Sequence, residues 1–137
     1  MRILNTKDPD DAIRLFPWIV PTPTETREQI VYGLAQRLKE APEDTLVLVA
    51  IERDIARAVL VAHVSEAKRR SVWLWQVRSV PGFRYSRLMF DALTSWTKAK
   101  HCKVIRGNTS NRDRDKVFER RYGFRRKGQE MVYHVAK

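Results

Sequence analysis

Three arginines flank a Pro-Gly pair that comes just before a predicted helix. Arg78, Arg84 and Arg87 lie within ten residues of one another, and the helix is expected to begin near Ser86. The first turn of a helix has N–H groups without intrahelical partners, and with arginine side chains nearby it can bind a phosphate or another anion. The alternative is that the Pro-Gly pair forms an ordinary turn and the arginines are solvated. The segment is therefore a candidate anion site.

Candidates for acid–base and metal chemistry are few. The predicted strand at 72–77 contains no acidic residue, and Glu66 lies in a polar turn where it is expected to be solvated. His63 alternates within an apolar strand, so a structural histidine is favoured over a catalytic base. Cys102 has basic neighbours that could lower its pKa, but it has no partner that spacing identifies, and a structural role is expected. The histidines do not have metal-ligand spacing, and no metal is expected.

The composition is that of one globular domain. The 137 residues suit a single domain spanning 1–137, and 43% of them are hydrophobic, which is enough for a core. The sequence has no apolar run of membrane-spanning length and no apolar N-terminal stretch typical of a signal peptide. One cysteine excludes an internal disulfide. We therefore expect a cytoplasmic protein, or one enclosed within a particle.

The formal net charge of +11 is unevenly distributed. Residues 1–44 contain six basic and eight acidic residues, so the whole positive excess lies in the rest of the chain. Residues 112–127 alone contain eight basic and three acidic residues. Such a surface is often simply solvated, and it would also suit an anionic cofactor, an acidic protein partner or nucleic acid. No base-reading motif accompanies it.

Hydrophobic periodicity and turn residues predict an alternating α/β chain. A strand at 2–5 precedes a helix capped by Asp8, and a second helix, capped by Thr24 or Thr26, extends to about Lys39. Short polar turns separate strands at 45–51, 55–64 and 72–77, which predicts an antiparallel meander. The other expected elements are a helix at 86–101, a strand at 103–109, a helix at 112–121 ended by Gly123, a short strand at 124–127 and a strand at 131–135.

The helix at 86–101 connects two strands that should be parallel neighbours, because such a crossover is right-handed and returns the chain to the same sheet. The expected fold is thus an α/β mixed sheet flanked by helices. Ser86 is a candidate cap of this helix, and in the next helix Val117 and Phe118 are expected to face inward. The inward stripe of the helix at 86–101 is predicted to contain Leu88, Met89, Ala92, Leu93 and Trp96. Trp73 and Trp75 share one face of their strand, either in the core or as the wall of a cleft.

This order of elements resembles the GNAT superfamily of acetyl-coenzyme A-dependent N-acetyltransferases over nearly the whole chain. The most specific part is Val104-Ile105-Arg106-Gly107-Asn108-Thr109-Ser110-Asn111, followed by Phe118 and by Tyr122-Gly123-Phe124. It is similar to the strand, asparagine, helix and Gly-Phe sequence of that family. The resemblance implies a GNAT-like fold, acetyl-CoA as cofactor, and transfer of an acetyl group to an amine that the sequence does not identify.

The cofactor loop of the family has the pattern Arg/Gln-x-x-Gly-x-Gly/Ala, and this chain has Pro81, Arg84 and Ser86 at the three signature places. Proline removes an N–H donor, and the arginines can supply part of the lost binding by direct charge. The resemblance implies that the cofactor-binding residues are Val77, Arg78, Arg84, Tyr85, Ser86, Arg87 and Asn111.

The resemblance also implies a tyrosine acid on the helix before the Gly-Phe pair. It usually lies four residues before the glycine, where this chain has Glu119, so Tyr122 is the candidate catalytic acid, displaced by about a helical turn. Because the loop and the acid both depart from the family pattern, the sequence leaves open whether the chain is an active enzyme.

Three functions stand as hypotheses. The first is an N-acyltransferase that uses acetyl-CoA and a small-molecule or protein acceptor. The second is a non-catalytic GNAT-like module for phage assembly or partner binding, because residues 104–110 with Phe118, Gly123 and Tyr133 also resemble internal virion proteins of short-tailed phages. The third, not favoured, is a basic nucleic-acid-binding protein. The oligomeric state is not predicted.

Overall fold

The computed structural model describes residues 1–67, 70–109 and 112–135. The described strands form one seven-stranded sheet in the order β1-β2-β3-β4-β5-β7-β6. The elements, in chain order, are β1 (Arg2–Asn5), α1 (Pro9–Arg14), η1 (Phe16–Trp18), α2 (Arg27–Glu40), η2 (Pro42–Asp44), β2 (Thr45–Glu52), β3 (Ile55–Ser65), β4 (Ser71–Ser79), α3 (Ser86–Ala99), β5 (Val104–Asn108), α4 (Arg112–Tyr122), β6 (Arg125–Lys127) and β7 (Glu130–His134).

The sheet has the predicted mixture of strand directions. β4 and β5 are parallel neighbours, and the other pairs of neighbouring strands among the described residues are antiparallel. Helix α3 makes the crossover between the parallel strands, as expected from the sequence. The turn between β2 and β3 consists of Arg53 and Asp54, both with positive φ, which matches the twist of a tight hairpin. The α/β mixed-sheet prediction is confirmed.

The ends of the helices follow local capping rules. Asp8 caps α1, and Thr26, one of the two residues considered, caps α2 with a capping box completed by Gln29. Gly123 ends α4 with φ of 79°, as predicted for a glycine that terminates a helix. The cap predicted for α3 is wrong: Tyr85 is the N-cap residue, without a side-chain hydrogen bond to the helix, and Ser86 is the first helical residue.

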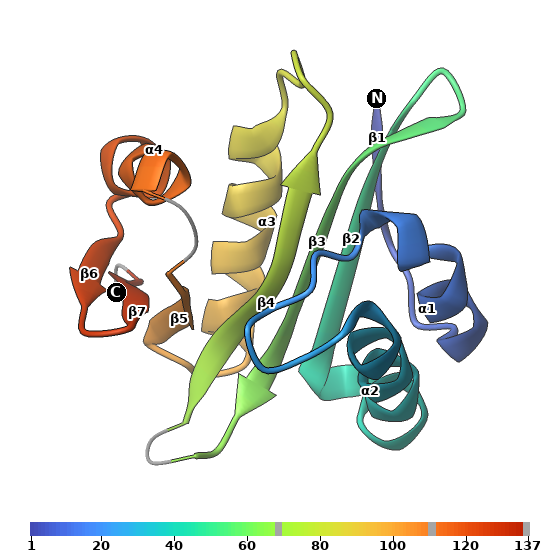
Figure 1. Cartoon of the computed structure of the whole chain (residues 1–137), viewed down its shortest axis with the longest axis horizontal. Helices are drawn as coiled ribbons and strands as arrows, with labels where there is room; N and C mark the ends of the chain where they lie inside the picture. Colours follow the sequence, from blue (N-terminus) through green and yellow to red (C-terminus); the bar gives the residue numbers. More distant parts are fainter. Residues whose placement is uncertain (68–69, 110–111, 136–137) are drawn as a thin grey trace.

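Helices cover both faces of the sheet (Figure 1). One core cluster lies between α1, α2 and the sheet, with Ile30, Leu34 and Val61 fully buried. The other lies between the sheet, α3 and α4, and contains Leu93 and Ile105. None of the helices in the described part of the chain has the length and apolar character needed to cross a bilayer.

Two side chains predicted to face inward are largely exposed. Leu88 in α3 is 49% exposed, and Val117 in α4 is 43% exposed although it lines the cavity described below. In α3, Met89 and Leu93 are buried as predicted, and Phe90 and Thr97 are buried as well; in α4, Asp115 is buried.

Strands β4 and β5 separate soon after they pair, and this separation determines where a site can lie. Their pairing covers only Val72–Leu74 and Ile105–Gly107, although β4 continues to Ser79. The register between β3 and β4 shifts at Trp75, which has no Cα partner in β3. A bulge of this kind increases local twist and turns one edge of the strand away from its neighbour. Beyond Leu74, therefore, β4 is not covered by β5.

Candidate active site

The first cavity lies on the α3–α4 side of the sheet and has a volume of about 360 Å³. Its floor is formed by β3 and β4, and its walls by α3 and α4. Most of the lining is apolar. It includes the side chains of Leu74, Val77, Phe83, Phe90, Phe118 and Tyr122. Arg78, Arg114 and Arg121 also line it, so an apolar cavity has cationic side chains on its walls. Such a lining suits a ligand with an apolar arm and anionic groups.

The loop from β4 to α3 forms a tight turn. The Val80 carbonyl accepts a 3.3 Å hydrogen bond from the Phe83 N–H, with Pro81 second in the turn and Gly82 third at φ +81°. These are the residues and the conformation of a type II turn. The turn brings the chain to the start of α3, whose first-turn N–H groups have no partners inside the helix. Ser86, in that first turn, lines the first cavity.

The three arginines of the loop do not converge on one point. Arg78 donates a 3.0 Å hydrogen bond to the Pro17 carbonyl in η1. Arg87 forms an ion pair with Asp91 (Nε–Oδ1, 3.3 Å) and donates a 3.1 Å hydrogen bond to the Arg121 carbonyl in α4. Arg84 is exposed. Arg87 therefore lies between α3 and α4, close to the first cavity, whereas Arg78 is attached to the N-terminal part of the chain.

Tyr122 forms part of a cavity wall in an aromatic cluster. Its ring stacks on Phe90 with centroids 4.5 Å apart, and Phe118 lies 5.6 Å away. Arg87 lies over both the Phe90 and the Tyr122 ring. Among the predicted cofactor residues, Val77, Arg78 and Ser86 line the first cavity, while Arg84, Tyr85 and Arg87 belong to the adjacent loop and helix start. The predicted contact at Asn111 lies outside the described residues.

The second cavity, of about 310 Å³, adjoins the first where β4 and β5 separate. Its walls come from β4, β5, the start of α4 and the loop before α2. Both ends of the Gln76 side-chain amide bond to Val20, accepting from its N–H (2.9 Å) and donating to its carbonyl (3.0 Å). Trp75 donates a 3.2 Å bond to Glu25. These contacts attach loop 20–25 to β4 and shape the mouth of the cavity.

The two cavities meet where β4 and β5 separate. They share four lining residues: Leu74, Val77, Arg114 and Phe118. Arg114 is the charged member of these four, and its Nη2 donates a 2.8 Å hydrogen bond to the Val77 carbonyl. Groups held in the two cavities can therefore approach each other beside β4.

Neither Arg114 nor Asp115 was predicted as a site residue, because the sequence of their helix is typical of a charged, solvated surface. Asp115 is only 7% exposed and lines the second cavity. Desolvation lowers the pKa of Arg114, and the nearby Asp115 carboxylate opposes that effect. Helical spacing could have indicated their burial. Arg114 lies four positions and Asp115 three positions before Phe118, so both are on the same face of α4 as this residue, which was predicted to face inward.

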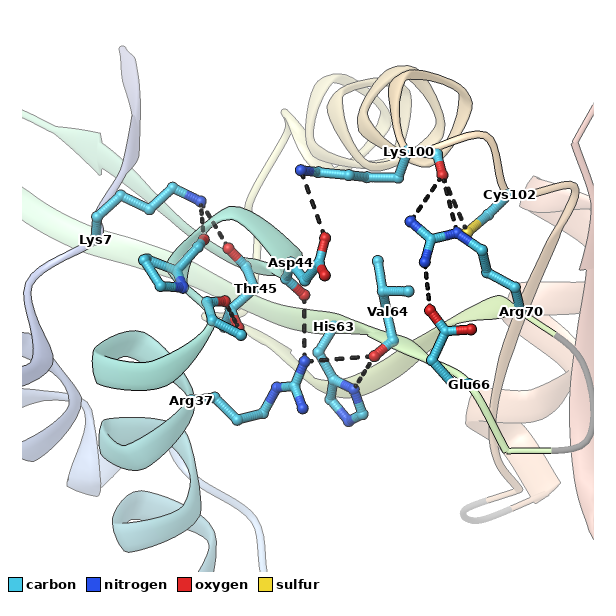
Figure 2. Close-up of polar contacts among 12 residues, drawn as sticks. Lys7, Arg37, Asp44, Thr45, His63, Val64, Glu66, Arg70, Lys100 and Cys102 are labelled. Atoms are coloured by element: carbon cyan, nitrogen blue, oxygen red, sulfur yellow. Dashed lines mark hydrogen bonds and ion pairs between the residues drawn. The ribbon is translucent and has the colours of Figure 1, made fainter.

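His63 and Cys102 lie in a different polar network, near the end of the sheet where β4 begins (Figure 2). The His63 Nδ1 is 3.1 Å from the Val64 carbonyl, and its ring meets the edge of Trp75 at 5.5 Å. Burial lowers the pKa of His63, with Arg37 adding to the effect. Burial raises the pKa of the Cys102 thiol, opposite to the shift suggested by its basic neighbours in the sequence. Both residues have the contacts expected of structural side chains.

Three other cations in Figure 2 donate hydrogen bonds to backbone carbonyls, and a fourth, Lys100, pairs with the Asp44 carboxylate at 3.6 Å. Lys7 donates to the Pro42 and Thr45 carbonyls, and Arg37 donates to the Asp44 and Val64 carbonyls. Arg70 donates to the Lys100 carbonyl and pairs with Glu66. Within residues 1–67, 70–109 and 112–135, no group of three His, Cys, Asp or Glu side chains is arranged to hold a metal ion.

Solved structures with the same arrangement decide the fold. A protein from Desulfovibrio desulfuricans assigned to the GNAT family of acetyltransferases superposes with a TM-score of 0.75 at 15% identity, over 98% of this chain and 99% of that one. The chain has the GNAT acetyltransferase fold. No family model and no curated protein sequence matches it.

Two further solved structures show the same GNAT fold. An aminoglycoside 6'-N-acetyltransferase from Acinetobacter haemolyticus has a TM-score of 0.70 at 19% identity, over 100% of this chain and 99% of that one. The PaiA N-acetyltransferase from Thermoplasma acidophilum, in complex with coenzyme A, has a TM-score of 0.64 at 14% identity, over 96% and 97%. The comparisons support neither the narrower resemblance to phage virion proteins nor nucleic-acid binding.

Proposed function

We propose that this chain is an N-acetyltransferase that binds acetyl-coenzyme A in the first cavity and an amine in the second. The observation that carries the proposal is the junction, where Leu74, Val77, Arg114 and Phe118 line both cavities. A direct transfer needs the acyl group and the amine to meet within bonding distance while each is held by its own part of the site. Two cavities that adjoin beside β4 and have otherwise separate linings meet this requirement.

The residues around the first cavity fit the cofactor. The first turn of α3 offers N–H groups, and Arg87 and Arg121 provide positive charge between α3 and α4 for the phosphates. The apolar lining at Val77 and Phe83 suits the pantetheine arm. When bound, the cofactor supplies an activated acetyl thioester. PaiA, which shares the fold, was solved with coenzyme A bound.

The predicted cofactor residues enter the proposal with different roles. Val77 contributes the wall beside the acyl group, and Ser86 contributes the helix start. Arg84 and Arg87 contribute charge near the phosphates, since the Pro-Gly turn does not provide the glycine backbone of the family loop. Tyr122 contributes a cavity wall through its stacking on Phe90, and the reaction does not depend on it as an acid.

Calorimetry with coenzyme A tests the cofactor half of the proposal. We expect 1:1 binding by the wild-type chain, weakened about tenfold or more when Arg84 and Arg87 are both changed to alanine, because two charge-assisted contacts are lost. Arg53→Ala is the matched control, since Arg53 is exposed in the β2–β3 turn. An absence of binding at millimolar coenzyme A would defeat the enzyme proposal.

The chemical half is tested by release of the coenzyme A thiol from acetyl-CoA. We expect release that is accelerated by a panel of primary amines added one at a time, together with an acetylated amine found by mass spectrometry. Binding of coenzyme A without acceleration by any amine, and without thiol release to hydroxylamine, would support the non-catalytic hypothesis instead.

A further inference from the structure

We propose that Arg114 and Asp115, consecutive residues at the start of α4, are the catalytic pair of this chain: Arg114 binds the acyl oxygen and Asp115 accepts the proton of the amine. The inference rests on the proposed function and assigns the chemistry of the junction to particular side chains. Neither residue belongs to the sites that the sequence predicted.

The position of Arg114 supports the first role. Its side chain lines both cavities, donates from Nη2 to the Val77 carbonyl at 2.8 Å, and lies over the Phe118 ring with Cζ 5.5 Å from the centroid. These contacts fix a planar cation at the edge of β4, at the place where the cavities join. A guanidinium carries five N–H donors in a rigid fork, and can therefore bond to more than one oxygen at once.

The surroundings make that charge effective. Arg114 is half-buried among Leu74, Val77 and Phe118, and its burial lowers the pKa of the guanidinium without removing its charge at neutral pH. A donor fixed in a poorly solvated site stabilises developing negative charge more strongly than the same donor in water. As an amine attacks, negative charge develops on the acyl oxygen, and an acyl group held at the junction of the two cavities would have this cation beside it.

Asp115 lies on the wall of the cavity in which the amine is proposed to bind. It lines the second cavity and not the first, and it is 7% exposed. Gln76, Asn108 and Thr109 add polar groups to the same lining, and the Asp115 carboxylate interacts electrostatically with Arg114. A carboxylate on the wall of the cavity that receives the amine is suited to hold that amine and to receive its proton.

The step balances as follows. The amine nitrogen forms a bond to the acyl carbon, the carbon–sulfur bond breaks, and its electron pair leaves with the coenzyme A sulfur as thiolate. The proton that the nitrogen loses passes to the Asp115 carboxylate, which returns it to the thiolate or to solvent. Arg114 keeps its protons throughout and acts by hydrogen bonding to the acyl oxygen.

The kinetic test uses α4 variants with matched controls on the same helix. Thiol release from acetyl-CoA is measured with hydroxylamine, a small neutral acceptor, for Arg114→Gln, Arg114→Lys and Asp115→Asn. The controls are Arg120→Gln and Asp113→Asn, which change exposed residues. We expect kcat to fall about 10²–10³-fold for Arg114→Gln and about 10²–10⁴-fold for Asp115→Asn. Arg114→Lys keeps the charge and should lose less than Arg114→Gln, and the controls should stay within about twofold of wild type.

A binding readout separates catalysis from simple packing. Acetonyl-CoA, which carries the carbonyl but cannot transfer it, should bind wild type about tenfold more tightly than coenzyme A, as one charge-assisted hydrogen bond predicts. Arg114→Gln should lose that preference while its affinity for coenzyme A stays unchanged. If Arg114→Gln does not fold, Arg114→Lys is used in the same comparison. We expect it to bind acetonyl-CoA more tightly than coenzyme A, but by a smaller factor than wild type does.

The outcomes distinguish this inference from the proposed function. Equal kcat for Arg114→Gln and Arg120→Gln, or equal weakening of coenzyme A and acetonyl-CoA by Arg114→Gln, would overturn the inference and leave the acetyltransferase proposal intact. A wild-type chain that neither binds coenzyme A nor releases its thiol would overturn both.

Discussion

Gly107 in β5 lies so close to Leu74 in β4 that a Cβ on the glycine would be 3.2 Å from the Leu74 carbonyl oxygen. This is the last paired position of the two parallel strands before they separate. A side chain at this position would require the two strands to move apart by a few tenths of an ångström at the base of the opening. We therefore expect the geometry of the junction to be sensitive to the size of the side chain at position 107.

Gly107→Ala should destabilise the fold by about 1–3 kcal/mol, since the added methyl group meets backbone rather than a flexible side chain. Urea unfolding measures the loss. Asn108→Ala is the control, because Asn108 is the next residue of β5 and is exposed. An unchanged free energy of unfolding for Gly107→Ala would show that β4 and β5 can move apart freely.

Gln76 should control access to the second cavity. Gln76→Leu removes both hydrogen bonds to Val20 and leaves a backbone N–H and carbonyl without these partners, at a cost of about 1–3 kcal/mol. Hydrogen exchange at the Val20 amide should become faster than in wild type. Gln36→Leu serves as control, because the Gln36 amide donates to the exposed Tyr32 hydroxyl. Unchanged exchange in Gln76→Leu would mean that other contacts hold the loop.

Thr26→Ala should cost about 1 kcal/mol of stability, since the threonine hydroxyl accepts from Gln29 N–H in the capping box of α2. Thr24→Ala should cost less, because Thr24 lies in the preceding loop. Thermal unfolding of the two variants compares them. Equal losses would contradict the assignment of Thr26 as the cap, which the sequence left open between these two residues.

His63 should make stability depend on pH. Burial lowers its pKa below the ordinary value of 6.5, so the unfolded chain binds a proton more readily than the folded chain. Stability is therefore fully present above about pH 6.5 and decreases as the pH falls from there through the lower pKa of the folded state. His63→Gln should flatten this part of the profile measured by urea unfolding between pH 5 and 8. A steeper decrease in the variant would contradict the direction of the shift.

The fold was predictable because its signals are local. Asp8 marks the start of a helix by the hydrogen bond that its side chain accepts, and Gly123 marks the end of one by its positive φ. The alternation of polar turns with apolar runs predicts the meander and its crossover helix. The boundaries of β1 were predicted without error, and those of β2 and β3 to within one residue.

The site was less predictable because it depends on relations between distant residues. The register shift at Trp75 and the early separation of β4 from β5 arise from pairing between strands, which residue spacing does not encode. For the same reason the burial of Asp115 was missed: its neighbours in sequence are charged, and the cavity that surrounds it is built from β4, β5 and loop 20–23. Leu88 was misplaced because apolar character alone does not show which side of a helix meets the sheet.

Amide chemical shifts during titration of the ¹⁵N-labelled chain with coenzyme A test the central claim most directly, because they report where the cofactor lies. We expect the largest changes at the start of α3, at Ser86 and Arg87, and at Val77 and Phe118 beside the junction, with little change at Arg37 and His63 in the network of Figure 2. Changes confined to residues outside the first cavity, or none at millimolar coenzyme A, would contradict the account.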